Sequence, residues 1–528
     1  MAGRLPPELI IEIARHLDLC QDVLFFSPSR RRVNVTTLEV LAQVCRNWRN
    51  ALIGCSRLWT TFRLYPYTGK LWSYPFHVQR WLQRAGPLGL DITISDFYIR
   101  ALPYQLLYVP DLYYILDTIT PFYKTWRLLE LSLPLEQYRP LFNMYAPELR
   151  MLEELRLSFS AESWFNGLAI YTFINAPLLT CVELCSRICI FLPLLDYIRF
   201  PYHQLTTLVC ENVFSSDPTF INHILRAATK LQYARLELVT NDNFDDAASA
   251  YYLFFRPFAT CPNLLKLEIT SQGLCDASFV LAGLTAPALK ELRLKHYGKI
   301  VPAGDFDLIL EAFQKRSQAP LRVVHFRHLH NLDENGPGLV PFLELVGETL
   351  KELIIESCTD LNVMDVLLAM IFPHYEGKFT GKPYEPYKAL LPNLKRFGIA
   401  ADFFHPASTG ELAKVVHSRG YDIDIHEDCE VMNSFVAPGC PLKEWLAAHR
   451  LEEFKVHFTD GVGFSSRAEA LLKSCQDRRN DGLLFNWKMS SSATPPPLVW
   501  SRRMYDQDPV FLQFDAHREE LVHRVLDD

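Results

Sequence analysis

The sequence predicts an α/β protein in which a small N-terminal helical module precedes an irregular solenoid of parallel strands and helices. Two observations predict this fold class. The first 60 residues carry apolar side chains at helical spacing, and a pattern of the form L-x-x-L-x-L then returns ten times. With 528 residues the chain is far longer than one core usually serves, so an extended repeat array or several domains are expected.

The first predicted helix spans Leu5 to Leu17. Pro6 and Pro7 fix φ near helical values at positions that need no amide donor, and Glu8 lies at the positive end of the helix dipole. One face of this helix is apolar and carries Leu9, Ile10, Ile13 and Leu17. The helix therefore needs an apolar partner, either in the same chain or in another protein.

A second helix is predicted from Thr37 to Ile53. Thr36 and Glu39 have the spacing of a capping box, and Gly54 is the expected stop. Its apolar stripe consists of Leu38, Leu41, Ala42, Cys45, Trp48 and Leu52. Together with the short apolar pair Leu58-Trp59, the two helices carry more apolar surface than sixty residues can bury by themselves.

Charge is distributed unevenly along the chain. The net charge is −7, but residues 1–60 hold eight arginines against five acidic residues, which leaves −10 on residues 61–528. The acidic total argues against nucleic-acid binding, because neutralising phosphates requires a basic surface. A weakly basic module on an acidic body suits an acidic protein partner.

Beyond residue 60 the apolar period changes to that of strands alternating with helices. Phe62 and Leu64 predict a short strand, residues 77–85 a helix, and residues 90–94 a second strand. The ten motifs then follow at steps of 24 to 44 residues, most of them in or near the range of leucine-rich repeats. Each unit would bury its apolar side only by stacking on its neighbours, with parallel strands on the concave face and helices on the convex face. The motifs begin at Leu128, Leu152, Leu179, Leu205, Leu231, Leu264, Leu289, Leu321, Leu350 and Leu394.

Proline supports this register, because it ends a helix and favours an extended residue before it. It stands two residues before the anchor leucine at Pro177, Pro262, Pro287 and Pro392. The pattern weakens beyond Ile399, where residues 451–456 predict one more strand and residues 468–475 a helix, and residues 490–497 are typical of a Ser/Pro-rich linker. We therefore predict three domains: the helical module over 1–60, the solenoid over 61–485, and a linker with a C-terminal tail over 486–528.

The location of the protein is predicted from its cysteines and apolar runs. Thirteen cysteines are scattered without a CxxC pair, and no signal peptide is evident, which favours a reduced intracellular compartment, cytoplasm or nucleus, over secretion. The stretch from Ser163 to Val182 is uncharged for 20 residues, but Asn166 and Pro177 make it too polar and too broken for a membrane span. No membrane association is expected.

No motif of a known catalytic chemistry is present. Cys181, Cys185 and Cys189 recur every four residues, but a strand would not make them converge, so buried thiols are favoured over a zinc site. A hydrogen-bonded or solvated patch is likewise favoured over a metal site for His325, His328 and His330. The sequence lacks GxxxxGK[ST], GxSxG and HExxH, and we predict no catalytic residue, cofactor or metal.

Three segments of the N-terminal module, Leu5-Pro6-Pro7-Glu8-Leu9, Val44-Cys45-Arg46-Asn47-Trp48 and Leu58-Trp59, together resemble the F-box. The order of segments along the chain, with the helical module first, then Gly86-Pro87-Leu88, and then degenerate leucine-rich repeats, looks most like that of the expanded F-box families of mushroom-forming fungi. The resemblance implies a non-catalytic substrate receptor of an SCF-type cullin-RING ubiquitin ligase. In such a receptor the F-box docks on a small acidic adaptor and through it on a cullin, and the repeats bind a substrate protein through exposed strand positions between the leucines.

The resemblance also implies which residues face or support the adaptor: Leu5, Pro6, Leu9, Ile13, Val44, Cys45, Trp48 and Trp59. The chain departs from the family in two places. Ala14 stands where the name-giving phenylalanine is usual, and the loop between the two helices is longer than usual. A leucine-rich-repeat scaffold that binds a partner without recruiting a ligase is the alternative interpretation.

Overall fold

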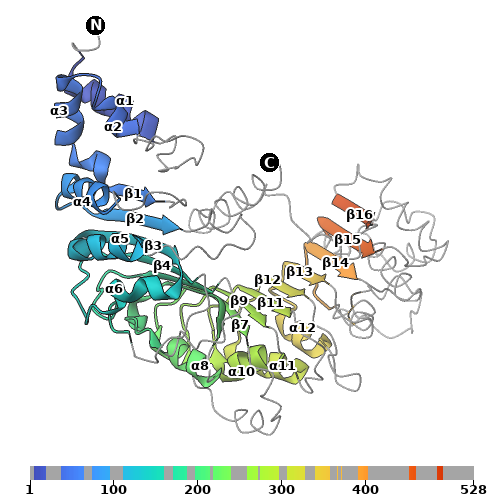
Figure 1. The fold of residues 1–528 in the computed structure, drawn as a ribbon. Coiled ribbons are helices and arrows are strands. Elements are labelled where there is room, and N and C mark those ends of the chain that lie inside the picture. The colour runs from blue at the N-terminus through green and yellow to red at the C-terminus, as the bar shows by residue number, and fades with distance from the viewer. Residues whose placement is uncertain are drawn as a thin grey trace, which may run out of the picture.

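A computed structural model describes residues 5–18, 37–64, 74–95, 111–159, 170–186, 197–214, 218–239, 259–271, 274–296, 306–327, 339–356, 366, 370, 390–401, 451–459 and 484–490. These residues form an α/β fold built on one curved sheet of 14 strands, with helices on its outer side and a helical module at its N-terminal end (Figure 1). The predicted fold class is confirmed at this level. No helix of the described part is long and apolar enough to cross a membrane.

The N-terminal module consists of α1 (Pro7–Asp18), α2 (Thr37–Leu41), α3 (Arg46–Gly54) and a short 3-10 helix, η2 (Ser56–Trp59). The prediction of one continuous helix from Thr37 to Ile53 is wrong. The amide of Val44 bonds to the carbonyl of Leu41 at 3.1 Å, which tightens the chain into a turn, and Cys45 is extended at φ −163° and ψ 173°. The Arg49 Nε atom donates to the Ala42 carbonyl at 3.1 Å, which satisfies a group that the break leaves without a helical partner.

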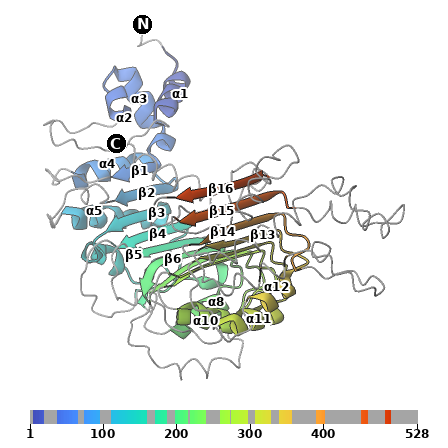
Figure 2. The same cartoon turned by 90° about the vertical axis from the view of Figure 1, so that its right-hand side faces the viewer.

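The strands of the large sheet follow one another in chain order, and every neighbouring pair is parallel. Figure 2 shows them side by side, with α8, α10 and α11 on the outer face. The strands are β1 (Thr61–Leu64), β2 (Leu90–Ser95), β3 (Trp126–Leu133), β4 (Glu154–Phe159), β5 (Cys181–Ser186), β6 (Thr207–Phe214), β7 (Tyr233–Val239), β9 (Lys266–Ser271), β11 (Glu291–His296), β12 (Val323–Arg327), β13 (Glu352–Glu356), β14 (Arg396–Ala401), β15 (Glu453–Thr459) and β16 (Leu484–Ser490).

The helices of the array connect these strands. They are α4 (Tyr74–Ala85), α5 (Asp111–Ile119), α6 (Arg139–Phe142), α8 (Pro218–Ala227), α10 (Leu274–Gly283), α11 (Phe306–Ser317) and α12 (Val340–Val346). Two short strands, β8 (Ala259–Thr260) and β10 (Leu284–Thr285), pair with each other outside the large sheet. A parallel neighbour requires a crossover. The described crossovers between β1 and β4, between β6 and β7, and between β9 and β13 contain these helices, which pack on the apolar side of the sheet.

The register shows one error in the predicted repeats. Leu129 pairs with Leu155 and Leu131 pairs with Leu157, so the first motif is two residues out of phase and its anchor is Trp126, not Leu128. A shift of two residues keeps every side chain on the same face of a strand, and for that reason the leucine pattern concealed it. Trp126 is fully buried, as an anchor should be.

The end of the sheet also differs from the prediction. The boundary placed after residue 485 falls inside β16, because Phe485 pairs with Phe454 and Trp487 with Val456. The sheet therefore continues to Ser490. Several predicted features lie outside the described residues: Thr36, the helix at 468–475, the linker beyond Ser490, and the tail.

Candidate functional site

The outer side of α1 is an exposed apolar line. Ile10 and Ala14 are fully buried, whereas Leu9, Ile13 and Leu17 keep 52%, 36% and 44% of their surface exposed. Residues four apart share one side of a helix, so the last three lie in a row. The helix predicted from Leu5 to Leu17 therefore has apolar residues both in the core of the module and on the surface of the module.

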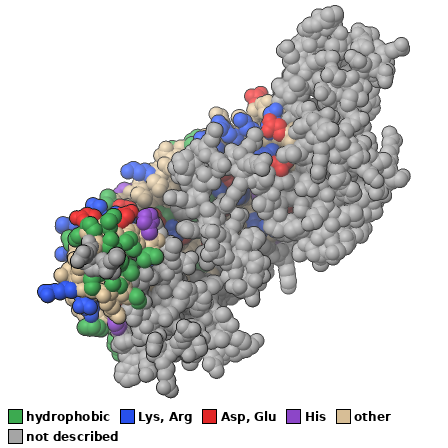
Figure 3. All heavy atoms as spheres, turned by 90° about the horizontal axis from the view of Figure 1, so that it is seen from above, with side chains coloured by type: hydrophobic (Ala, Val, Ile, Leu, Met, Phe, Trp, Pro, Cys, Tyr) green, Lys and Arg blue, Asp and Glu red, His purple; other side chains and the backbone are tan. Residues whose placement is uncertain are grey.

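Three further apolar side chains of the module are exposed, namely Val40, Val44 and Ile53, at 53%, 50% and 36%. The exposed apolar residues of the described module are thus six, and we refer to them together as the module face: Leu9, Ile13, Leu17, Val40, Val44 and Ile53. Apolar side chains gather on the module in the view from above (Figure 3). Exposed apolar groups concentrated on one small unit are typical of a protein-interaction surface.

The structure divides the predicted adaptor residues into two groups. Pro6, Leu9, Ile13 and Val44 are exposed, and Leu5 and Cys45 are half-buried, so six of the eight have surface that another protein could contact. Trp48 and Trp59 are buried, and they can only support that surface from within. Val40 and Ile53 are exposed apolar residues that the sequence analysis missed, because neither lies on the predicted stripe.

Trp59 joins the module to the strand array. Its indole Nε1 donates to the Leu52 carbonyl at 2.9 Å, and its ring centroid is 4.7 Å from that of Trp81 on α4. The Arg84 guanidinium lies 4.3 Å above the same ring, and its Nη1 atom is 3.9 Å from the Glu39 carboxylate on α2. The ring therefore contacts the module and the first array helix at once.

Trp59 also occupies the anchor position of the first strand unit. It stands three residues before Phe62, which pairs with Ile92, and Ile92 pairs with Leu129, whose own anchor is Trp126. The pattern Trp59-x-x-Phe62-x-Leu64 is thus the repeat motif with tryptophan in place of leucine. Allowing an aromatic residue at the anchor would have revealed this unit in the sequence.

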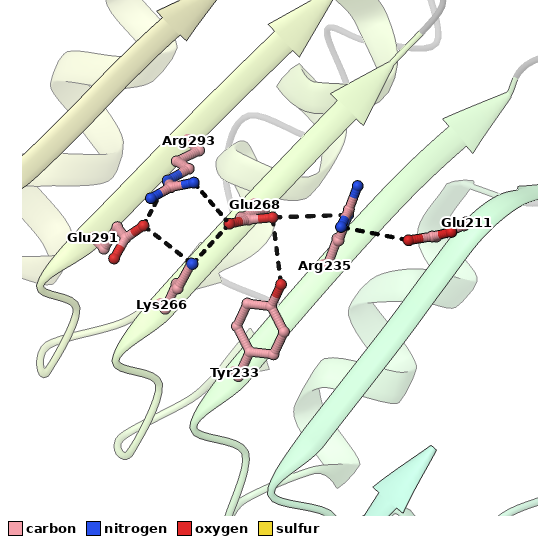
Figure 4. A network of polar contacts seen from close by, with 7 residues as sticks. All are labelled: Glu211, Tyr233, Arg235, Lys266, Glu268, Glu291 and Arg293. Carbon is pink, nitrogen blue, oxygen red and sulfur yellow. Dashed lines mark hydrogen bonds and ion pairs between the residues drawn. The ribbon is translucent and has the colours of Figure 1, made fainter. Parts of the chain in front are cut away.

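The concave face of the sheet carries alternating charges that are connected across strands. Figure 4 shows six of these charged residues, together with Tyr233, on β6, β7, β9 and β11, with Glu268 at the centre. Glu268 lies 2.9 Å from Lys266, 3.5 Å from Arg293 and 3.7 Å from Arg235, and it accepts a hydrogen bond from the Tyr233 hydroxyl at 3.3 Å. We call these residues the charged network: Glu211, Tyr233, Arg235, Lys266, Glu268, Glu291 and Arg293.

The electrostatics of Glu268 follow from this arrangement. Burial alone would raise the pKa of its carboxyl, but Lys266, Arg293 and Arg235 together hold that pKa below its ordinary value. The outer pairs complete the network: Arg235 is 3.4 Å from Glu211, and Lys266 is 3.3 Å from Glu291. Glu268 is therefore ionised and lies between three cationic side chains.

Carboxylates outnumber cations on the concave face of β3 to β6. Arg156 is 3.2 Å from Glu154 and 3.7 Å from Glu183. Burial raises the pKa of Glu183; Arg156 opposes this shift, whereas the carboxylates of Glu130, Glu211 and Glu154 add to it. This part of the face therefore has a negative potential.

Three of the described cysteines are deeply buried. Burial raises the pKa of Cys181, Cys210 and Cys261 to about 12, so these thiols are poor nucleophiles at neutral pH. His325 lies 3.6 Å from Glu356, whereas Cys189, His328 and His330 lie outside the described residues. Within the described ranges no three metal-binding side chains are close enough together to hold an ion.

No protein-family model matches the chain, and no curated protein sequence matches it significantly. The fold and the two surfaces nevertheless define a class of architecture. It is a curved α/β array of stacked strand units with a charged concave face, and a helical module with an exposed apolar face is attached to its first unit.

Proposed function

We propose that the protein is a substrate receptor of an SCF-type cullin-RING ubiquitin ligase. The helical module is its F-box and docks on the acidic adaptor, the degenerate leucine-rich repeats bind a substrate protein, and the chain itself is not an enzyme. The observation that carries the proposal is the exposed apolar row of α1, Leu9, Ile13 and Leu17, on a small module that exposes three further apolar side chains. Such a receptor needs no catalytic group, because it acts by raising the concentration of bound substrate near the ubiquitin-carrying enzyme.

The module face has the chemistry that an acidic adaptor with an apolar groove would recognise. Its six members are roughly half exposed, and covering each would contribute on the order of 1 kcal/mol. Four arginines of the described module, Arg15, Arg46, Arg49 and Arg57, are exposed, and their positive charge suits an acidic partner. Apolar contact at the centre with charge around it is the usual composition of a protein interface.

The joint at Trp59 supports a receptor that holds its substrate in one orientation. Trp59 is fully buried between Leu52 of the module and Trp81 of the array, and the side chain of Arg84 is only 12% exposed. A close-packed joint transmits position, because side chains in such a core have few alternative arrangements. Adaptor and substrate would thus be kept at a fixed distance within the ligase.

An adaptor pull-down tests this function. The full chain should retain the purified adaptor, and a Leu9→Ala, Ile13→Ala double variant should retain at most about a tenth as much, because both side chains are exposed and their loss leaves the fold intact. A Leu308→Ala, Leu345→Ala double variant is the matched control, since both leucines are equally exposed but lie on the array helices α11 and α12. No retention by the wild type, or equal retention by the first double variant, would contradict the proposal.

The alternative function is a repeat scaffold that binds a partner without recruiting a ligase. The observation that favours it is Ala14, which is fully buried where the family usually has a phenylalanine. The same pull-down separates the two functions, because a scaffold would bind its partner through the concave face and leave the adaptor unbound.

A further inference from the structure

A row of cations follows the edge of the sheet at which the strands begin. One residue stands between the buried anchor leucine and the first residue of β11, β12 and β13, and these three residues are Lys290, Arg322 and Lys351. The amide of Arg322 donates to the Lys290 carbonyl at 2.7 Å, and the amide of Lys351 donates to the Arg322 carbonyl at 2.9 Å. The three residues therefore lie side by side on neighbouring strands, and we call them the basic rim.

The side chains of the basic rim are exposed, and none of the three has an ion-pair partner in the part of the chain that the structure describes. The acidic residues that begin two of the strands bind other cations, because Glu291 pairs with Arg293 and Glu352 pairs with Arg396. In the three preceding units the same position is uncharged, and the row consists there of Thr206, Gln232 and Leu265.

Cations outnumber carboxylates in the loops that form this edge. The loops that lead into β11 to β14, residues 286–290, 318–322, 347–351 and 391–395, hold four cations and one carboxylate, Glu348. The fourth cation, Lys395, continues the row and pairs with Glu452 at 3.7 Å. Four cations against Glu348 and Glu452 leave a net charge of +2, so the edge attracts an acidic partner.

We propose that the basic rim binds an acidic helix of the substrate protein, one that carries a carboxylate on the same face in successive turns. The inference deepens the proposed function and rests on it in one respect, that the repeats hold a polypeptide. Three exposed cations without partners in the described chain are complementary to such a face, and each can pair with a carboxylate without breaking an ion pair of its own.

The spacing of the row favours a helix over an extended segment. From Lys290 to Lys351 there are two strand spacings, which is about 9.6 Å at the usual distance between strands. Carboxylates at positions i, i+4 and i+7 of an α-helix span about 10.5 Å, whereas three alternate residues of an extended segment span about 13.4 Å. The helix differs from the row by about 1 Å and the extended segment by about 4 Å.

A peptide titration with the full chain tests this site. The first probe is a fluorescein-labelled, alanine-based helical peptide with glutamate at i, i+4 and i+7, which we call the one-face peptide. The second has the same composition, with its three glutamates on different faces of the helix. At low salt the one-face peptide should bind at least about threefold more tightly, and added salt should weaken its binding because exposed charges are screened.

Variants of the basic rim should change this binding. The triple variant Lys290→Gln, Arg322→Gln, Lys351→Gln should bind the one-face peptide at least about fivefold more weakly. The matched control has the same charge and changes two lysines and one arginine that are exposed on other units, and it should bind as the wild type does: Lys124→Gln, Arg226→Gln, Lys230→Gln.

Charge reversal separates a lost contact from a lost fold. Glutamate at all three positions of the basic rim should make the chain prefer a peptide with lysine at i, i+4 and i+7 over the one-face peptide, by at least about fivefold. A misfolded variant would not acquire this preference.

Four results would overturn the site: no binding of the one-face peptide by the wild type, equal affinity for the two glutamate peptides, unchanged affinity in the glutamine variant, or tighter binding of a thymidine oligonucleotide than of the one-face peptide. The titration contains no adaptor, so its outcome is separate from that of the pull-down. Adaptor retention without peptide binding would overturn this site and leave the proposed function standing. Peptide binding without adaptor retention would support the site and contradict the ligase role.

Discussion

Replacing Trp59 by leucine should loosen the helical module while leaving the strand array folded. Leucine is the usual residue at the anchor position, so the apolar core of the first strand unit is retained. The substitution removes three contacts of the indole ring. The hydrogen bond to the Leu52 carbonyl contributes about 1 kcal/mol, the cation–π contact with Arg84 about 0.5–2 kcal/mol, and the ring contact with Trp81 about 0.5–1.5 kcal/mol. Since these contacts share one ring, the free energy of opening the module should fall by about 2–4 kcal/mol.

Hydrogen exchange followed by mass spectrometry measures this effect locally. Amides of α1 and α3 should exchange about 30- to 900-fold faster in Trp59→Leu, whereas those of β4 to β13 should keep wild-type protection. Trp126→Leu is the matched control, because Trp126 is the buried anchor of β3 and its replacement should affect the array and not the module. Wild-type protection of α1 and α3 in Trp59→Leu would refute the assignment of Trp59 as the joint.

Three further predictions follow from the described contacts. Ala14→Phe should destabilise the module by about 1–3 kcal/mol in urea unfolding, because Ala14 is fully buried and a larger side chain must displace its neighbours. Unchanged stability would show that the module has room for a phenylalanine at this position. Glu268→Gln should lower the free energy of unfolding at pH 7 by about 1–3 kcal/mol. The pKa of Glu268 is lowered in the folded state, so the stabilisation by its carboxylate is lost as the pH falls below 4.5 and through the folded-state pKa, and the difference between variant and wild type should shrink there. A difference that is constant from pH 7 to pH 3 would contradict this. Cys181 and Cys210 should resist alkylation at pH 8 in the native protein and react in urea, because burial raises the pKa of both thiols to about 12; modification in the native state would be seen by mass spectrometry.

The strand array was predictable because its signal is local and repeated. A strand lies at each of the ten motif positions and at residues 451–456, since two apolar residues two apart in the sequence recur in every such unit. Four strands lack a leucine at the anchor position and were harder to recognise. In the sequence that position is Trp59 for β1, Gly89 for β2, Trp126 for β3 and Gly482 for β16, and β16 was missed.

The break between α2 and α3 could not be predicted from the apolar stripe. The stripe continues through Ala42 and Cys45 as though the helix were unbroken, because both residues also face the core of the module from the turn. The helix stops because Cys45 is extended. The side chain of Arg49 in α3 donates a hydrogen bond to the Ala42 carbonyl in the turn, which accompanies the break. Such a side-chain bond leaves no periodic trace in a sequence.

The candidate surfaces were predictable to different degrees. The exposed row Leu9 and Ile13 was singled out from the resemblance, whereas the separation of Ile10 into the core depends on how α1 is rotated against α3. The charged network needed the register, because Glu268 meets cations from β7 and β11 that are distant in the sequence. The sequence shows charged residues at the positions between the leucines, but it does not show which of these residues form ion pairs.

Calorimetric titration of the purified adaptor into the full chain tests the central claim most directly. We expect saturable one-to-one binding with a negative heat-capacity change, because apolar surface is buried. In Ile13→Asp, which places a charge in the exposed row of α1, the affinity should fall at least about tenfold. Absence of binding by the wild type, or undiminished affinity in Ile13→Asp, would contradict it.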